Sequence, residues 1–361
     1  MCFVIVTQFP WKHLCECPFQ SDDLTFSVIP LYIMTIAILG ILLNIFVLMV
    51  FCLHKMSCTT AEIYLSNLAA ADLLLVSFLP VYAFYRFDWT FGLAMCKLVS
   101  MSILMNTYSS IYFMVLIGID RYLALVHPLF SEGIRRPKFA KLGCVVVWIL
   151  GFLFSLPALI HRDLTAPINN TKSNCFMNFP SHNVQLTSDL SLSVLGFIIP
   201  IFIISFCTIK IIKSLKNRIT EGVNAKKVDH KATTLVLAVL LAFLICWVPY
   251  HLVKILYFLK DAKLFTSCSV FKLLHICSQI FTYLAYFNST LNPILYVLVG
   301  KNFQKKVKEL FRQWDHKRTS TLSNTVSTKL PRSSKLSEKR VHVLSKLAWV
   351  FHGFLSPETC K

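Results

Sequence analysis

The sequence predicts an all-α membrane protein, a seven-transmembrane helix bundle with a short cytoplasmic amphipathic eighth helix. Of the 361 residues, 56% are apolar and only 15% are charged, whereas soluble domains are about one quarter charged. Apolar runs recur along most of the chain, and seven of them are long enough to cross roughly 30 Å of hydrocarbon. The basic residues are unevenly distributed between the connections, as in membrane proteins.

Each predicted span is an apolar stretch of about 20 residues, the length that a membrane-crossing helix needs. The connections between the spans are short, except 162–189 and 213–230. The seven predicted spans are 29–53, 63–83, 96–120, 140–160, 190–212, 232–258 and 271–299.

The distribution of basic residues predicts the orientation. A formal net charge of +19 could also indicate a nucleic-acid-binding protein. However, 27 of the 36 Lys and Arg residues lie on one set of predicted connections and nine on the other. Cytoplasmic loops carry such an excess. We therefore expect a multi-pass plasma-membrane protein with its N-terminus outside, its C-terminus in the cytoplasm and no nucleic-acid partner.

The chain divides by composition into four predicted segments. In the interfacial helix, Phe303, Val307, Leu310 and Phe311 share one face and lysines surround the others, a pattern typical of helices lying in the membrane interface. The tail is poor in apolar residues and is expected to be disordered. The segments are an extracellular N-terminal segment (1–28), the bundle (29–299), the amphipathic interfacial helix (301–314) and a disordered cytoplasmic tail (315–361).

Five spans contain residues that hydrophobicity alone would exclude. Asp72 lies deep in an apolar run, where a charge costs roughly 2.5–3.5 kcal/mol, so it should face the bundle interior. The other spans hold, in order, Asp120-Arg121-Tyr122, Trp148, Cys246-Trp247-Val248-Pro249 and Asn292-Pro293-Ile294-Leu295-Tyr296. In this order, with Asn44 and Pro200 at matching places, the set resembles the rhodopsin-like G-protein-coupled receptors over about residues 29–313.

Shorter stretches resemble the kinin (bradykinin) receptors within that family. The resemblance implies a receptor, not an enzyme, for an extracellular peptide of the kinin type. It also implies signalling through heterotrimeric G proteins, mainly Gq, to phospholipase C and calcium. It also implies receptor kinases and arrestin as partners for the ten Ser and Thr residues of 319–337; an ordinary disordered tail is the alternative. The stretches are 51–55, 61–65, 87–89, 119–126 and 291–301.

A transporter or channel is the rival class. It predicts broken helices in corresponding halves and ionisable residues along a pathway. Here Asp72 is the deeply placed acid of the predicted spans, and the two halves show no repeat. An intramembrane hydrolase would need a nucleophile and a base, or metal ligands, on facing helices.

The polar residues around Asp72 suggest a cation site. A carboxylate ringed by amide and hydroxyl oxygens suits an allosteric sodium ion, because hard cations prefer oxygen ligands. A water-filled polar network without an ion is the alternative, and no other cofactor is expected. By resemblance, the residues converging on Asp72 are Asn44, Asn106, Ser110, Asn288 and Asn292.

Arg121 is expected to act as a conformational switch. By resemblance it pairs with Asp120 and with Asp229 of the sixth span in the inactive state, and movement of that span frees it for the G protein. Snorkelling to the lipid headgroups is the alternative. Trp247 lies one turn from the kink at Pro249 and would sense a ligand, or it would simply pack there. The same machinery includes, by resemblance, Tyr122, Asn292, Pro293 and Tyr296.

Several cysteines and one glycosylation sequon lie in the predicted outer segments. The resemblance implies a Cys96–Cys175 disulfide, which an oxidising exterior permits. It also implies a Cys17–Cys268 disulfide, with Cys15 as the competing partner. The sequon that begins at Asn169 lies in an exterior loop and predicts a glycan there.

The predicted ligand pocket leaves the ligand open. Ile103 stands where amine receptors carry an acid, so a small amine is not expected. Kinin receptors hold the N-terminal arginine of the peptide with acids whose places are taken here by Tyr257 and His275, and Lys254 makes the rim more basic. The chain is thus a kinin receptor or, alternatively, a receptor for a different peptide or an orphan member of the group. The other predicted pocket residues are Trp247, Tyr250 and Gln279.

Overall fold

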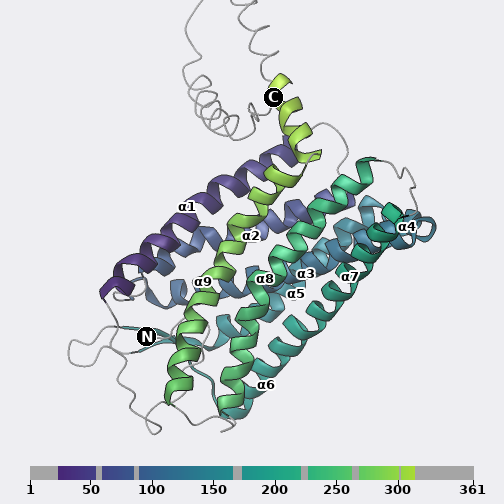
Figure 1. The fold of residues 1–361 in the computed structure, drawn as a ribbon. Coiled ribbons are helices and arrows are strands. Elements are labelled where there is room, and N and C mark those ends of the chain that lie inside the picture. The colour runs from purple at the N-terminus through teal and green to yellow at the C-terminus, as the bar shows by residue number, and fades with distance from the viewer. Residues whose placement is uncertain are drawn as a thin grey trace, which may run out of the picture. The chain divides into compact units, whose positions relative to one another are not determined.

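The computed structural model describes residues 23–53, 59–84, 89–165, 173–220, 227–261, 268–300 and 302–313. The long helices are α1 (Asp23–Leu53), α2 (Thr60–Phe84), α3 (Gly92–Val126), α5 (Pro137–His161), α7 (Ile199–Thr220), α8 (Lys227–Asp261) and α9 (Cys268–Val299). The short elements are α4 (Pro128–Ile134), strands β1 (Arg162–Leu164) and β2 (Cys175–Met177), α6 (His182–Ser193) and the π-helical turn η2 (Val194–Ile198). Figure 1 shows the long helices running side by side as a bundle.

The predicted helical bundle is confirmed, since each predicted span lies within helix. Six helical stretches of the described chain are long and apolar enough to cross a membrane. The remaining long helix, α9, has 32 residues, and buried polar side chains such as Asn288, Ser289 and Thr290 interrupt its apolar run. The bundle therefore has seven long helical segments when α6, η2 and α7 are taken as one.

The predicted span 190–212 differs most from the structure. Helix begins earlier, at His182, and passes through the π turn η2 before continuing as α7. Gly196 lies in this turn, and a Cβ atom there would overlap the ring of Tyr108 on α3. The absence of a side chain at Gly196 thus lets the turn approach α3 closely.

The central helix of the bundle is α3. It packs against α2, α5, α7 and α8, and α1 packs against α2 and α9. An indole–amide hydrogen bond joins α5 to α2: Trp148 Nε1 donates to Asn67 Oδ1 over 3.0 Å. The Trp148 ring also meets Phe113 of α3 edge-on. The fourth-span tryptophan therefore connects three helices.

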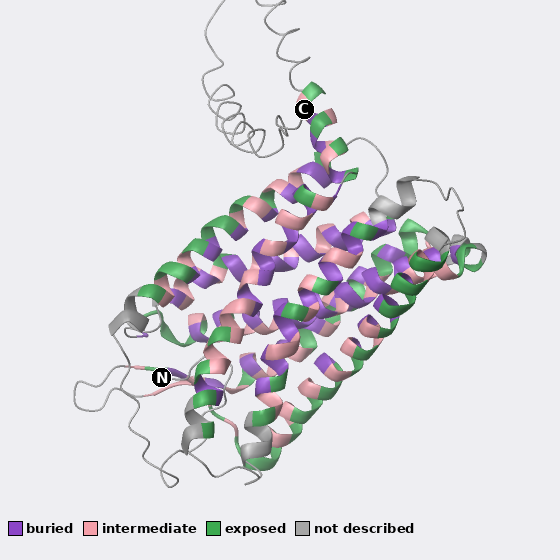
Figure 2. Cartoon of the chain, viewed as in Figure 1, coloured by how far each residue is buried: buried purple, intermediate pink, exposed green. Residues whose placement is uncertain are grey.

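Apolar side chains cover the outer surface of the bundle. Figure 2 shows buried residues concentrated on the faces that helices turn toward one another and exposed residues on the outward faces. Many outward residues are large and apolar; Leu31 and Phe202 are each 70% exposed and Ile245 is 65% exposed. Soluble proteins rarely expose so much contiguous apolar surface, whereas helices in lipid do.

Local sequence determines where several helices start. Thr59 and Glu62 form a capping box at α2: the Thr59 amide donates to Glu62 Oε2 over 2.9 Å, and the Glu62 amide donates to Thr59 Oγ1 over 3.4 Å. Helix α5 begins with Pro137, which lacks the amide hydrogen that this position leaves unbonded. Gly92 has φ +75°, which favours glycine, and it begins α3.

A short antiparallel hairpin covers one end of the bundle. Strands β1 and β2 pair with Asp163 opposite Phe176. Cys96 at the start of α3 is disulfide-bonded to Cys175 in β2, with Cα atoms 5.8 Å apart. Trp89 is buried in the apolar cluster that contains both cysteines, and its Nε1 donates to the Gly92 carbonyl over 2.8 Å. The hairpin was not predicted from the sequence.

The second unit comprises residues 301–361, of which the structure describes 302–313 as a helix. Phe303, Val307 and Leu310 are buried along one of its faces. Lys305 and Glu309 form an ion pair of 3.8 Å one turn apart. This helix lies within the predicted 301–314 segment; its position in the membrane interface stays a prediction.

Candidate functional site

The two ends of the bundle carry different chemistry. We call the end with the β1–β2 hairpin the hairpin end, and the end where α3 finishes with Asp120 and Arg121 the arginine end. At the hairpin end, the predicted Cys96–Cys175 disulfide is confirmed. The other predicted disulfide cannot be assessed, because Cys17 and the side chain of Cys268 lie outside the described residues, as does Asn169.

Between the two ends, Asp72 is fully buried and bonded on both oxygens. Asn106 Nδ2 donates to Asp72 Oδ1 over 3.1 Å, and Asn292 Nδ2 donates to Asp72 Oδ2 over 2.9 Å. Asn106 Nδ2 also lies 3.3 Å from Ser110 Oγ. The Ser289 side chain of α9 interacts electrostatically with the same carboxylate. The structure thus brings α2, α3 and α9 together at one acid.

Several oxygens near this acid have no hydrogen-bond partner among the described residues. They belong to the side chains of Asn44, Asn288 and Asn292. Asn44 Nδ2 donates to the carbonyls of Gly40 and Ser289, each over 2.9 Å. Buried polar atoms normally have hydrogen-bond partners. These side-chain oxygens are therefore available to bind a cation or a water molecule. Ser289 was missed at the sequence level, although it adjoins Asn288 in the seventh span.

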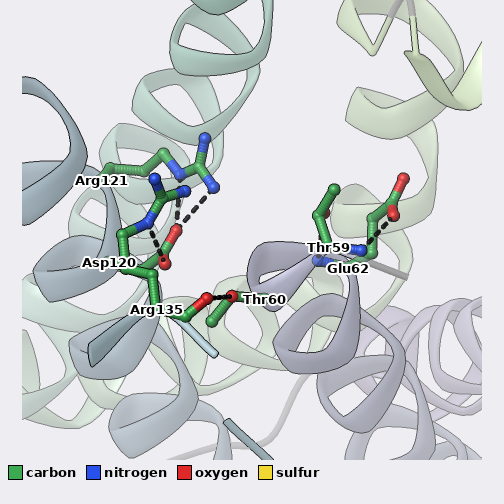
Figure 3. Close-up of polar contacts among 6 residues, drawn as sticks. All are labelled: Thr59, Thr60, Glu62, Asp120, Arg121 and Arg135. Atoms are coloured by element: carbon green, nitrogen blue, oxygen red, sulfur yellow. Dashed lines mark hydrogen bonds and ion pairs between the residues drawn. The ribbon is translucent and has the colours of Figure 1, made fainter. Parts of the chain in front are cut away.

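At the arginine end, one buried carboxylate holds two arginines (Figure 3). Arg121 donates to Asp120 Oδ2 from Nε over 2.9 Å and from Nη2 over 2.6 Å. Arg135, which follows α4, donates from Nε to Asp120 Oδ1 over 3.0 Å. The Thr60 hydroxyl of α2 donates to the Arg135 carbonyl over 3.1 Å. Helix α3 and the segment after α4 therefore meet at a single acid, and α2 is joined to them through the Arg135 carbonyl.

The pairing of Arg121 with Asp120 agrees with the sequence-based expectation. Asp229 lies in α8, but its side chain is outside the described residues, so its predicted pairing with Arg121 stays a prediction. The contact of Arg135 was missed. It lies 15 residues from Asp120 across a turn, and no periodic pattern connects such positions. Nearby, the Tyr122 hydroxyl lies 3.1 Å from His127 Nε2.

Aromatic side chains surround Trp247 in the half of α8 nearer the hairpin end. We call Phe197, Trp247, Tyr250 and His251 the aromatic cluster. The rings of Phe197 and His251 stack with centroids 3.7 Å apart, and Trp247 meets Tyr250 edge-on at 5.7 Å. All four are buried. His251 and Phe197 were missed from the sequence, although a histidine inside an apolar span was a usable signal.

The other predicted pocket residues are partly brought together. Ile103 is buried in α3. His275 and Gln279 lie one turn apart on α9, with Gln279 Nε2 2.9 Å from His275 Nε2. Lys254 lies one turn beyond Tyr250, with Nζ 5.0 Å from the centre of the Tyr250 ring. The side chain of Tyr257 lies outside the described residues.

The remaining predicted switch residues lie within helices. Pro249 is inside α8 and Pro293 is inside α9. Tyr296 is almost fully buried, one turn after Asn292 on the same helix. Asn292 therefore links this segment to Asp72. The roles of these residues in switching stay predictions.

Comparison with known proteins agrees with this arrangement. Residues 43–296 match the family model of the 7 transmembrane receptor (rhodopsin family). The chain belongs to this family, the rhodopsin-like G-protein-coupled receptors, and is a signalling receptor rather than an enzyme.

Within that family the chain belongs to the group of the bradykinin receptors. It is 38% identical to the B2 bradykinin receptor of Homo sapiens over 330 residues, which cover 89% of the chain and 84% of that receptor. It is 40% identical to the B2 bradykinin receptor of Oryctolagus cuniculus over 286 residues, 78% of each protein. It is 35% identical to the human B1 bradykinin receptor over 316 residues, 86% of the chain and 90% of that receptor.

Proposed function

We propose that this receptor binds a kinin-type peptide at the hairpin end and activates heterotrimeric G proteins of the Gq class at the arginine end, which raises calcium through phospholipase C. The observation that carries the proposal is the separation of an incompletely bonded aromatic cluster from the Asp120–Arg121 ion cluster along one bundle. A two-state bundle biased at one end and read out at the other is what signalling across a membrane requires.

The orientation that this function needs has the hairpin end outside the cell. The excess of Lys and Arg on the other side supports it. Antibody labelling of intact cells tests it, with epitope tags at either terminus. We expect the N-terminal tag to be labelled without permeabilisation and the C-terminal tag only after it; the reverse pattern rejects the orientation.

The direct test of the ligand is calcium release in transfected cells exposed to a panel of kinins, including des-Arg forms and variants with neutral N-termini. We expect a response to at least one member. The basic Lys254 and the histidine at 275 favour a second candidate, a receptor of this group for a different peptide. Silence across the panel would remove the kinin ligand and leave this second candidate.

An allosteric sodium ion near Asp72 is part of the proposal. The support is the donor set: two carboxylate oxygens, Ser110 Oγ and the unpartnered amide oxygens of Asn288 and Asn292. Asn106 and Asn292 now point amide nitrogens at the acid, so a bound cation requires these amides to turn. Agonist affinity is compared in sodium and in a large organic cation. An Asp72→Asn receptor that keeps the same sodium dependence would exclude the site and favour a water network.

The switch at Arg121 is tested through its proposed partner on α8. Asp229→Ala should raise ligand-independent nucleotide exchange if the carboxylate restrains Arg121 in the inactive state. An unchanged basal rate argues against this part of the switch, while the Asp120 pair would remain.

Receptor kinases and arrestin are proposed to act on the Ser and Thr residues of 319–337, which lie outside the described residues. Alanine at all ten positions should abolish agonist-dependent arrestin recruitment and leave the calcium response. Recruitment that persists would favour an ordinary tail without this role.

A further inference from the structure

Three hydrogen-bond donors on α8, two of them from the aromatic cluster, form no hydrogen bond with the described residues. Trp247 Nε1 and the Tyr250 hydroxyl are buried, and neither has a hydrogen-bond partner among the described residues. Lys254 lies one turn beyond Tyr250 and is partly exposed. Its ammonium is 5.0 Å from the centre of the Tyr250 ring. The residues follow one another along one side of the helix at spacings of three and four.

Lys254 carries a charge that no described residue neutralises by direct contact. Among the described ion pairs and hydrogen bonds, none involves its ammonium. Asp189 of α6 interacts with it electrostatically, but the two form no ion pair. His251 also lies within electrostatic range of Lys254. A partly desolvated ammonium without a contacting counter-charge is costly.

The neighbouring helices add polar groups to this region. Tyr82 of α2 and Tyr108 of α3 lie within electrostatic range of Tyr250. Arg162, at the start of β1, lies within electrostatic range of Tyr286 of α9, as does Tyr250. Among the described residues these groups are hydroxyls and a cation, and Asp189 is an acid within electrostatic range of both Lys254 and Tyr108.

The donor set selects the chemistry of the ligand. Indole and ammonium groups only donate hydrogen bonds, and a phenol donates readily. A group that accepts several hydrogen bonds and carries a negative charge complements all three, and a carboxylate has these properties. A cationic group would meet Lys254 with like charge.

We propose that Lys254 and the hydroxyl of Tyr250, one turn earlier on α8, form an anion-binding subsite that receives a carboxylate of the ligand. The inference rests on the proposed peptide function and names one chemical feature of the peptide. The carboxylate is either the C-terminus of the peptide or an acidic side chain, and both sources share the same contacts.

The first experiment needs no knowledge of the natural peptide. The purified full-length receptor is titrated in detergent with 3-phenylpropanoate and, separately, with its neutral isostere 3-phenylpropanamide, and binding is measured from the rise in melting temperature. We expect the carboxylate to bind about tenfold more tightly than the amide, since one charge-assisted contact is worth about one factor of ten. Equal binding of the two compounds by the wild-type receptor overturns the proposal.

Variants assign the effect to Lys254. Lys254→Met should reduce the acid-to-amide ratio to about one, and Lys254→Arg should retain most of it. Lys210→Met is the matched control, because Lys210 also lies over an aromatic ring, with Nζ 5.5 Å from the centre of Phe206, on α7. A ratio that survives Lys254→Met contradicts the assignment. The wild-type comparison decides the proposal if Lys254→Met fails to fold.

Experiments with peptides identify which carboxylate of the ligand binds the subsite. Bradykinin as free acid and as C-terminal amide is compared by calcium release, on the wild-type receptor and on Lys254→Met. A loss of about tenfold in potency on amidation, present only with Lys254, supports the C-terminus as the source. Equal potencies overturn that source, and peptides with Asp or Glu exchanged for Asn or Gln then test the side chain. If bradykinin causes no calcium release while 3-phenylpropanoate still binds more tightly than its amide, the kinin ligand is wrong and the proposed subsite is retained.

Discussion

At the arginine end of the bundle, both oxygens of Asp120 are bonded within the chain, by Arg121 on one side and Arg135 on the other. Toward the hairpin end, Trp247 Nε1, the Tyr250 hydroxyl and His251 Nε2 have no hydrogen-bond partners among the described residues. Buried polar groups are usually satisfied. The difference teaches that the Asp120 carboxylate is neutralised within the chain, whereas the donors toward the hairpin end are not satisfied by the described residues.

The largest effect is expected when the Cys96–Cys175 disulfide at the hairpin end is removed. Cys96→Ser removes the disulfide to Cys175, and loss of a native disulfide typically costs about 2–5 kcal/mol. We expect most of the receptor to be lost from the cell surface, measured by antibody against an extracellular tag. Cys52→Ser is the control, because Cys52 is a free, exposed cysteine of α1. Normal surface levels of the Cys96 variant would show that packing alone holds this end together.

Substitution of Asp120 should release the ion cluster at the arginine end. Asp120→Asn leaves Arg121 and Arg135 without their shared carboxylate, and breaking a buried ion pair costs about 3–5 kcal/mol. We expect ligand-independent nucleotide exchange to rise several-fold, measured on membranes with a non-hydrolysable GTP analogue. Glu62→Gln is the control, since Glu62 caps the start of α2 and lies apart from the Asp120 cluster in Figure 3. Unchanged exchange would mean that this ion cluster does not restrain the receptor.

A smaller effect is expected when only the second arginine is removed. Arg135→Met keeps the Asp120–Arg121 pair, and the Arg135 side chain is 30% exposed. An ion pair of such exposure contributes about 0.2–1 kcal/mol, so basal exchange should rise less than with Asp120→Asn. The matched variant Arg136→Met, at an exposed neighbouring position, should leave exchange at the wild-type level. Equal effects of the two variants would remove Arg135 from the cluster.

The smallest effect concerns the hairpin and pH. The Leu164 amide donates to Asp163 Oδ1 over 2.8 Å and Asn178 Nδ2 donates to Asp163 Oδ2 over 3.2 Å. These bonds favour the charged form and hold the pKa of Asp163 below its ordinary value. Their stabilisation is therefore present above the unfolded-state pKa and is lost as the pH falls through the folded-state pKa.

Hydrogen exchange of the hairpin amides measures this effect, with wild-type and Asp163→Asn receptors compared at each pH. We expect the wild type to be better protected at about pH 6 and the two to converge only as the pH falls through the lowered folded-state pKa of Asp163, where the carboxylate becomes protonated. A difference that stays constant across this range would contradict a role for the charge. Protection that is equal at pH 6 would mean that the hairpin does not depend on Asp163.

The bundle was predictable because hydrophobic length is a local property that each span displays by itself. Asp72 was predictable because acids in apolar runs are rare. Asp120 and Arg121 were identified through the resemblance of Asp120-Arg121-Tyr122 to the family, not through hydrophobicity. Arg135 was not predictable, since its contact is created by the turn between α3 and α5, and an arginine in a basic loop has no distinguishing pattern. Gln279 was proposed for the pocket, but its bond to His275 depends on the helical phase of α9.

The hairpin and the π turn were missed for a related reason. Strands of three residues are too short to display an alternating pattern. The π turn contains Gly196, which packs against Tyr108 on another helix, and no single-span pattern contains such a contact. Both features arise from contacts between segments that are distant in the sequence.

The π turn affects how residues of this receptor are matched to those of other receptors. A turn of this kind inserts one residue into a helix, and one residue corresponds to about 100° of rotation, given 3.6 residues per turn. Everything before Val194, including Asp189, is thus rotated about the helix axis relative to an uninterrupted continuation of α7. Residue equivalences for 182–193 that are counted backwards from Pro200 will be shifted by one residue against any receptor whose corresponding segment is a regular helix. Mutagenesis designed on such a count would test a different face of the helix from the intended one.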